Sequence, residues 1–318
     1  MNTRLSVVIP TRDTCELTLG CLRSLEAASI EETEVVVVDD GSVDDTRSQV
    51  QRFFPAVRIL ALARSRGFTC AANLGLRESK GELLLLLNSD TEVAADAPRH
   101  LTEALAGNPE LGACGPQLFF PNGRPQWSSG PEPTLLWFFV LATGLAVLLQ
   151  RVPAYRRVRT SNAPAATSVD WLRGTAMAIR KVAWLEAGPF DERFAFYCQD
   201  LDFCMSLRAA GWQVALVPLA KVVHHQGATI ARSRGTVESP PATERYHPEL
   251  LWTDFVRLTE KRYGVERARR VAWLLQCGGH FRILARRLAG LLLAKEKRDL
   301  WERDTASFRQ ATRALSVW

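Results

Sequence analysis

The stretch that decides the fold is residues 81–93, GELLLLLNSDTEV. Five consecutive leucines, residues 83–87, are too few to cross a bilayer and too uniformly apolar for a strand with one wet face. They therefore predict a strand buried on both faces of a parallel sheet. The run ends in Asn88-Ser89-Asp90, and open α/β sheets bind their ligands at the carboxyl ends of strands. A carboxylate there is expected to meet a cation, although an isolated N-x-D can also simply cap a turn or a helix.

Similar apolar runs alternate with helical patterns through the first part of the chain. The expected strands are residues 5–9, 34–38, 57–62 and 83–87, with helices over residues 14–27 and 69–79. Strands that alternate with helices indicate a doubly wound, mostly parallel α/β sheet.

Polar residues follow three of these strands. They are Thr11-Arg12-Asp13, Asp39-Asp40-Gly41-Ser42 and Asn88-Ser89-Asp90. A single D-D-G-S is weak evidence, because Asp-Gly turns are common. Three polar strand ends at one edge of a sheet are stronger evidence and predict a binding site there.

Length, charge and cysteine content narrow the class of protein. With 318 residues and 47% hydrophobic content, the chain can bury a large core in one domain with an extension or in two domains. Seven cysteines without a C-x-x-C spacing favour reduced thiols in the cytoplasm. No long apolar segment precedes the first strand, so a secretory signal is not expected.

The formal charge of +6 is concentrated in the last quarter of the chain. From Arg245 onward, sixteen lysines and arginines face eight aspartates and glutamates, so the preceding residues are slightly acidic. Nucleic acid and an anionic membrane surface are the two classes of partner that such a basic tail can bind.

Four segments in this order resemble the nucleotide-sugar-binding half of the family 2 glycosyltransferases. They are VVIPTRD, VVVVDDGSVDDT, R-G-F-x-x-A-x-N-x-G and LLLLNSDTEV. Residues 171–212 are similar to the acceptor-side segment of the family, and the resemblance covers roughly residues 4–264. It is strongest to the rhamnosyltransferase-like branch that builds bacterial surface polysaccharides. The resemblance implies a GT-A fold, in which N-x-D is a variant of the D-x-D motif.

The resemblance also implies a donor site and a metal site. The expected donor-binding residues are Thr11, Arg12, Asp39, Arg66, Asn73 and Asn88. Asp90 matches the carboxylate that holds Mg²⁺ or Mn²⁺ against the donor diphosphate, and Asp40 is expected to orient the neighbouring loop. His224, after strand-like residues 214–218 and 221–223, is the second expected metal ligand. The adjacent His225 leaves this register open by one residue, and a histidine that bonds only to backbone is the alternative.

Asp200 matches the general base that deprotonates the acceptor hydroxyl. Where the family usually has Glu-Asp, this chain has Gln199-Asp200. A neighbouring like charge raises a carboxylate pKa, so glutamine at this position is expected to ease the ionisation of Asp200. In the alternative interpretation, Gln199, Asp200 and Asp202 form the solvated first turn of a helix that runs to Ala210.

Two apolar segments are unusual for a soluble core. Residues 133–150 carry no charge, and their fifteen-residue centre, residues 135–149, is shorter than the roughly 20 residues that span a bilayer, which indicates an interfacial segment. Residues 271–301 combine leucine and tryptophan with basic side chains, a pattern that favours a membrane surface over nucleic acid. A helical hairpin packed on the catalytic domain, or a dimer interface, is the alternative.

Together these observations predict a catalytic domain over residues 1–244, with a donor half to about residue 115, an acceptor half from about residue 116 and an apolar insertion near 133–150. A basic amphipathic helical extension follows over residues 245–318. The expected activity is metal-dependent, inverting transfer of a sugar, for example rhamnose, from a nucleotide-diphosphate donor to a saccharide or polyprenyl-diphosphate-linked acceptor. The expected location is the cytoplasmic face of a bacterial membrane. The sequence leaves open whether the chain forms a homo-oligomer. A catalytically silent nucleotide-sugar-binding subunit and a sugar nucleotidyltransferase are the alternatives.

Overall fold

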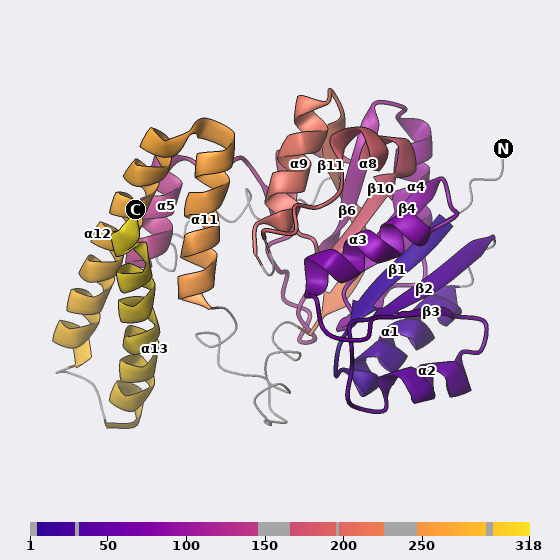
Figure 1. Ribbon diagram of the computed structural model, residues 1–318, viewed down its shortest axis with the longest axis horizontal. Helices are drawn as coiled ribbons and strands as arrows, with labels where there is room; N and C mark the ends of the chain where they lie inside the picture. Colours follow the sequence, from indigo (N-terminus) through magenta and orange to yellow (C-terminus); the bar gives the residue numbers. More distant parts are fainter. Residues whose placement is uncertain (1–4, 29–31, 146–165, 195–196, 226–246, 291–294) are drawn as a thin grey trace. The chain divides into compact units, whose positions relative to one another are not determined.

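The computed structural model describes residues 5–28, 32–145, 166–194, 197–225, 247–290 and 295–318. The chain divides into two compact units (Figure 1). One contains residues 1–131 and 158–239, and the other contains residues 132–157 and 240–318. The first unit carries the sheet, and the second is helical.

The sheet unit is built on one mixed sheet. In the described residues its strands lie in the order β3-β2-β1-β4-β10-β6-β11-β5, and β8 pairs with β11. The strands are β1 Leu5–Thr11, β2 Thr33–Asp39, β3 Arg58–Ala61, β4 Leu83–Leu87, β5 Thr91–Val93, β6 Leu111–Phe119, β8 Thr167–Ser168, β10 Ala176–Arg180 and β11 Gln213–His224. β1 to β4 run parallel, whereas β10 is antiparallel to both β4 and β6. The mostly parallel α/β sheet predicted from the sequence is therefore confirmed.

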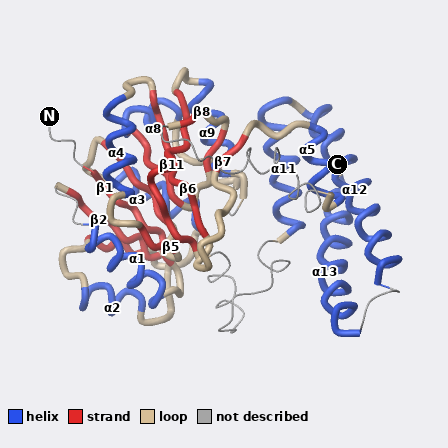
Figure 2. The backbone as a smooth tube through the Cα atoms, turned by 180° about the vertical axis from the view of Figure 1, so that it is seen from behind, coloured by secondary structure: helices blue, strands red, loops and turns tan. Residues whose placement is uncertain are grey.

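The leucine run of β4 is buried on both faces, as its composition predicts. Leu83, Leu85 and Leu87 pack in a core cluster that contains residues of α1 (Cys15–Ala28) and α4 (Ala97–Gly107). Leu84 and Leu86 point to the other face, toward residues of α3 (Phe68–Glu78) and α9 (Gln199–Ala209). Because side chains alternate between the faces of a strand, helices on both faces require an unbroken apolar run. Figure 2 shows this layering from behind.

Three strand ends lie at one edge of this sheet. Thr11 at the end of β1 pairs with Asp39 at the end of β2, and Val8 of β1 pairs with Leu86 of β4. Asn88, two residues beyond Leu86, therefore leaves the sheet near the same edge. This register brings together the polar residues that follow the strands.

Two features of the sheet were not part of the sequence-based expectation. β10, for which no strand was expected, enters the sheet antiparallel between β4 and β6. The two strand-like pieces expected at 214–218 and 221–223 form the single strand β11, whose pairing with β6 shifts register between Val217 and Lys221.

Smaller elements complete the sheet unit. They are α2 Thr46–Phe53, α8 Lys181–Ala187 and a two-stranded sheet of β7 Ser129–Gly130 and β9 Trp171–Leu172.

The helical unit joins two segments that are distant in the sequence. Its helices are α5 Leu135–Thr143, α11 Pro248–Tyr263, α12 Val265–Gly290, α13 Lys295–Ala314 and a 3-10 turn Leu315–Val317. A Cβ atom at Gly278 of α12 would lie 2.6 Å from the Cβ atom of Ala142 in α5, so the two backbones lie very close together. The apolar segment near 133–150 thus groups with the C-terminal helices rather than with the sheet, although residues 146–150 lie outside the described residues.

None of the described helices has both the length and the apolar character needed to cross a membrane.

Candidate active site

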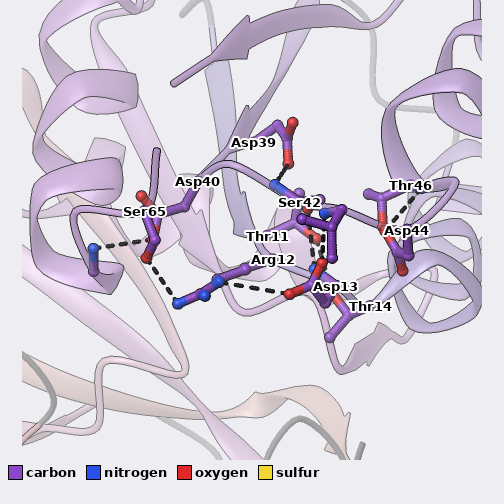
Figure 3. A network of polar contacts seen from close by, with 12 residues as sticks. Thr11, Arg12, Asp13, Thr14, Asp39, Asp40, Ser42, Asp44, Thr46 and Ser65 are labelled. Atoms are coloured by element: carbon purple, nitrogen blue, oxygen red, sulfur yellow. Dashed lines mark hydrogen bonds and ion pairs between the residues drawn. The ribbon is translucent and has the colours of Figure 1, made fainter. Parts of the chain in front are cut away.

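The ends of β1 and β2 place a threonine and a carboxylate side by side (Figure 3). Thr11 is buried, and its hydroxyl bonds to the hydroxyls of Thr14 at 2.8 Å and Thr18 at 2.7 Å. Asp39 is buried too, and its Oδ1 accepts the backbone N–H of Ser42 at 3.1 Å. Within the described residues Oδ2 of Asp39 accepts no hydrogen bond, so this oxygen can accept one from a ligand.

Asp40 holds the loop that carries Arg66. Its carboxylate accepts the hydroxyl of Ser65 at 2.7 Å and the backbone N–H groups of Arg66 at 2.7 Å and Gly67 at 3.0 Å. The same Ser65 hydroxyl accepts Nη1 of Arg12 at 2.8 Å. The orienting role expected for Asp40 is confirmed, and Arg12 and this loop are linked.

Arg66 and Asn73 both reach the segment before α9. Nη2 of Arg66 lies 3.7 Å from Oε2 of Glu192, in an ion pair that is half exposed. The Asn73 amide donates to Phe190 O at 2.8 Å and to Glu192 Oε1 at 3.2 Å, and it accepts the N–H of Phe190 at 3.0 Å. With its amide bound to protein on both sides, Asn73 ties residues 190–192 to α3.

The Asn88-Ser89-Asp90 turn follows β4. The backbone N–H of Asn88 donates to Thr175 O at 2.8 Å, and the hydroxyl of Ser89 bonds to that of Thr14 at 3.1 Å. Oδ1 of Asn88 is buried without a hydrogen-bond partner in the described part of the chain. A buried acceptor without a donor is costly, so a hydroxyl or N–H of a bound ligand is the natural partner for this atom.

Asp90 faces His224, the last residue of β11. Nε2 of His224 lies 3.4 Å from Oδ1 of Asp90, and both side chains are buried. His225 instead points to the surface, where it pairs with Glu92 at 2.7 Å. Of the two histidines, His224 is therefore the one that faces Asp90. Burial acts to raise the Asp90 pKa, but the attraction and hydrogen bond of His224 outweigh it, and the pKa is lowered.

Gln126 is a third member of this group, and the sequence did not single it out. Its Oε1 lies 2.9 Å from Nδ1 of His224, and its Nε2 donates to the backbone oxygen of His224 at 2.7 Å. It lies 98 residues from His224, in a stretch without motif or periodicity, so nothing in the local sequence pointed to it.

Asp90 and His224 fit a divalent cation. Ligands on neighbouring corners of an octahedron, about 2.1 Å from Mg²⁺, are roughly 3.0 Å apart, close to the separation of these two atoms. Among the described residues no group of three or more histidine, cysteine or acidic side chains forms a closed metal site. Two protein ligands suit an ion that shares its remaining positions with phosphate oxygens and water.

Asp200 lies at the start of α9 and is fixed by main-chain donors. Its Oδ2 accepts the N–H of Gly174 at 2.8 Å, and its Oδ1 accepts the N–H of Leu201 at 2.8 Å. Burial raises the Asp200 pKa, although the two backbone bonds and the charge of Arg173 act in the opposite direction. A carboxylate with a raised pKa is a stronger base than an ordinary surface aspartate.

The first turn of α9 is not the solvated turn of the alternative interpretation. Gln199 is only 8% exposed and Asp202 only 2%. Oε1 of Gln199 has no hydrogen-bond partner within the described residues. Cys198, just before the helix, has a φ of +64°, an unusual conformation for a residue with a side chain. Buried polar atoms and backbone strain together are typical of a functional site.

One short segment connects the turn after β4 to Asp200. Thr175 O accepts the N–H of Asn88, and the preceding residue, Gly174, donates to Asp200. The turn after β4 and the carboxylate of α9 are therefore held by two consecutive residues.

Comparison with protein families and curated proteins agrees with this geometry. The model of the family described as Glycosyl transferase family 2 matches residues 6–172, just over half of the chain. An N-acetylglucosaminyl-diphospho-decaprenol L-rhamnosyltransferase of Mycobacterium tuberculosis is 30% identical over 225 residues, covering 66% of this chain and 72% of the relative. An O-antigen biosynthesis protein of Myxococcus xanthus is 26% identical over 71% of this chain and 18% of its own length.

Solved structures show the same fold at low sequence identity. The mannosyltransferase PcManGT of Pyrobaculum calidifontis, in complex with GDP-Man and Mn²⁺, matches with a TM-score of 0.54 at 19% identity, over 100% of this chain and 88% of that enzyme. GalNAc-T7 with UDP, GalNAc and Mn²⁺ matches with a TM-score of 0.58 at 17% identity, over 81% of this chain and 48% of that enzyme. These likenesses show the GT-A fold.

The polar strand ends at one edge of a mostly parallel sheet, the match of the family model over half the chain and the 30% identical relative lead to one conclusion: the chain belongs to glycosyl transferase family 2.

Proposed function

We propose that this chain is an inverting, metal-dependent glycosyltransferase that moves a sugar from a nucleoside diphosphate to a lipid-linked saccharide in bacterial surface polysaccharide synthesis. The observation that carries this proposal is the half-buried carboxylate of Asp200, fixed through Gly174 to the segment that also pairs with Asn88. Gly174 contacts the proposed base, and Thr175 contacts the proposed donor site. This proximity suits direct transfer between two bound substrates.

Asp200 would act as the general base. In a single displacement, the acceptor oxygen forms its bond to the anomeric carbon while the bond to the leaving diphosphate breaks, and the acceptor proton passes to Asp200. Each carboxylate oxygen accepts one backbone N–H and keeps a further lone pair. The raised pKa of Asp200 favours acceptance of this proton, and such catalysis contributes about 10²–10⁴-fold.

The donor would bind along the strand ends. Oδ2 of Asp39 can accept an N–H of the nucleotide base beside Thr11, and Oδ1 of Asn88 can accept a ribose hydroxyl. Arg12 and Arg66 are half exposed and carry the positive charge that a diphosphate attracts.

Asp90 and His224 would hold the divalent cation. When bound, Mg²⁺ or Mn²⁺ would supply charge neutralisation for the leaving diphosphate. The proximity of the carboxylate and imidazole supports this assignment, as does the Mn²⁺ in the two solved enzymes of the same fold.

The acceptor and the sugar are inferred from relatives. The name of the Mycobacterium tuberculosis relative describes an L-rhamnosyltransferase that acts on a sugar linked to a polyprenyl diphosphate. We therefore propose rhamnose as the leading donor sugar and a polyprenyl-diphosphate-linked saccharide as the leading acceptor.

A face of α12 supports attachment to the membrane that carries such an acceptor. Its exposed apolar residues are Trp273, Phe281, Leu284 and Leu288. At about 100° per residue these four side chains span roughly 80° of the helix surface. Exposed Arg270 and Arg287 lie on or beside this face, so it combines apolar and positive groups as an anionic membrane surface requires. We propose that this face rests on the cytoplasmic leaflet.

A panel of nucleotide sugars with Mn²⁺ and no acceptor tests the proposed chemistry. Slow release of nucleoside diphosphate from one donor is the expected result. Measurable donor binding without turnover, even with lipid-linked acceptors, would indicate a silent binding subunit. Formation of nucleoside triphosphate from a nucleotide sugar and pyrophosphate would indicate a nucleotidyltransferase.

A further inference from the structure

Gln126 bonds to His224 twice, once at the backbone and once at the ring. Its Nε2 donates to His224 O at 2.7 Å and to Phe119 O at 3.2 Å, and its Oε1 lies 2.9 Å from Nδ1 of His224. The side chain is 1% exposed, so water does not compete for these bonds.

The surroundings of the amide fix its orientation. Two backbone carbonyls, which can only accept, face one end of the amide, so that end must be the NH₂ group. The other end is therefore the oxygen, and it faces Nδ1. Because a carbonyl oxygen only accepts, Nδ1 of His224 must carry a proton.

A proton on Nδ1 leaves the lone pair of a neutral imidazole on Nε2. This is the nitrogen that lies 3.4 Å from Oδ1 of Asp90. In the metal-free protein a proton on Nε2 can bridge these two acceptors, which is the hydrogen bond that lowers the Asp90 pKa, and a metal ion would take the place of that proton. A metal-binding histidine commonly has its second ring nitrogen bonded to a carbonyl or carboxylate that fixes the tautomer.

We propose that Gln126 is a positioning residue that holds His224 as the Nδ1–H tautomer and aims Nε2 at the cation site shared with Asp90. This inference rests on the proposed metal-dependent function and adds a residue that the sequence motifs do not contain. Gln126 touches neither the cation nor the donor in this role and acts only through His224.

The backbone around Gln126 is itself held in place. Its N–H donates to Leu118 O at 2.8 Å, and its carbonyl accepts Nε2 of Gln117 at 3.0 Å. Ser128, two residues on, accepts the N–H of Leu118 at 2.8 Å. Residues 126–128 are thus anchored to β6 independently of His224. The position of the Gln126 amide therefore does not depend on the ring that it orients.

The tautomer can be measured without a substitution. Nitrogen-15 NMR of the full-length, metal-free protein at a pH where the imidazole is neutral should report His224 as Nδ1–H with an unprotonated Nε2. A His224 signal with the proton on Nε2 would overturn the proposal. This measurement does not depend on enzymatic activity.

Gln126→Met tests the consequence for the cation. Methionine keeps the length of the side chain but has no amide, so His224 should lose its tautomer preference and the affinity for Mn²⁺ alone should fall roughly 10- to 100-fold. Unchanged Mn²⁺ affinity in a folded Gln126→Met variant would overturn the proposal.

Gln117→Met is the matched control. Gln117 is also buried, and its amide donates to Leu118 O, Gln126 O and the hydroxyl of Ser128. Because the backbone N–H of Gln126 still donates to Leu118 O when the Gln117 amide is lost, we expect this variant to lose stability but to bind Mn²⁺ nearly as the wild type does. An equal loss of Mn²⁺ affinity in both variants would mean that Gln126 acts only on the fold. If wild-type protein with the Nδ1–H tautomer bound no Mn²⁺, the metal-dependent function would fail rather than the role of Gln126 in setting the tautomer.

Discussion

The backbone N–H of Gly174 donates to Oδ2 of Asp200 at 2.8 Å, and a Cβ atom at position 174 would stand 3.1 Å from the Cβ atom of Asp200. The main chain therefore approaches the carboxylate more closely than most side chains would allow. Because a bond from the main chain has few ways to relax, this contact sets the position of the proposed base.

Gly174→Ala should displace Asp200 by a few tenths of an ångström. We expect kcat to fall about 10-fold with donor KM little changed, since small misplacements of a catalytic group are costly. Steady-state kinetics and the thermal midpoint measure the two effects. Gly107→Ala is the control, because a Cβ atom there meets nothing within 4 Å. Full activity of Gly174→Ala would contradict the assignment of Asp200.

Asp200→Asn should lower kcat by about 10²-fold or more while donor KM stays within a few-fold. The amide removes the basic oxygen and also turns an NH₂ group toward one of the two backbone donors, so some stability should be lost. Asp202→Asn, at a buried neighbour in the same turn, should cost stability but keep turnover. The reverse ranking of the two variants would make Asp202 the base.

The acid limb of the kcat/KM profile should lie above the ordinary aspartate pKa of about 3.9, because burial raises the Asp200 pKa. Stability changes with pH in the opposite direction to activity: activity rises as Asp200 loses its proton, whereas the unfolding free energy falls. The folded carboxyl keeps its proton at a pH where the unfolded one has lost it, so the contribution of Asp200 to the unfolding free energy falls as pH rises from the unfolded pKa through the folded pKa. The positive charge of Arg173 limits how far the Asp200 pKa rises. Asp200→Asn should flatten that slope in urea unfolding measured against pH.

Asp90→Asn should reduce Mn²⁺-stimulated release of nucleoside diphosphate by roughly 10²-fold or more, because an amide is a poor ligand for a hard cation. Glu92→Gln is the matched control: this carboxylate lies two residues away and pairs with the partly exposed His225. We expect it to leave Mn²⁺ affinity and turnover unchanged. Near-normal turnover of Asp90→Asn at limiting Mn²⁺ would refute the metal site.

Trp273→Ser combined with Phe281→Ser should reduce co-sedimentation with anionic phosphatidylglycerol vesicles, because both side chains are exposed on α12. Wild-type binding should weaken with salt and with neutral vesicles. Val182→Ser combined with Leu185→Ser removes exposed apolar groups from α8 and should have no effect.

These substitutions test the face of α12 better than removal of the tail, since α12 packs against α5 and its loss would uncover buried residues. If wild-type protein stays in the supernatant at low salt, the face of α12 serves a contact between proteins.

Local composition was enough to predict the elements around β4. The expected strand at 83–87 coincides with β4, and the helix expected at 69–79 corresponds to α3, Phe68–Glu78. These patterns arise from burial of neighbouring residues, so they are visible in a short window of sequence. The edge at which Thr11, Asp39 and Asn88 gather follows from the parallel order of the strands.

Local sequence patterns could not predict contacts between residues that are distant in the sequence. Gln126 was not found because its role depends on a strand pairing that brings it to His224, and the antiparallel entry of β10 is likewise a property of the assembled sheet. The apolar, charge-free segment at 133–150 stood out in the sequence, but its packing partner did not. Its neighbour in the fold, Gly278 of α12, carries no side chain that could have marked it as a partner.

The close contact between Ala142 and Gly278 has a consequence for synthesis on the ribosome. At 5–20 residues per second, α12 is made roughly 7 to 27 s after α5. During this interval the apolar side chains of α5 have no helical partner from their own unit, while the sheet unit is still being completed. A nascent chain stalled in this window should bind chaperones that recognise apolar segments, and release should coincide with emergence of α12.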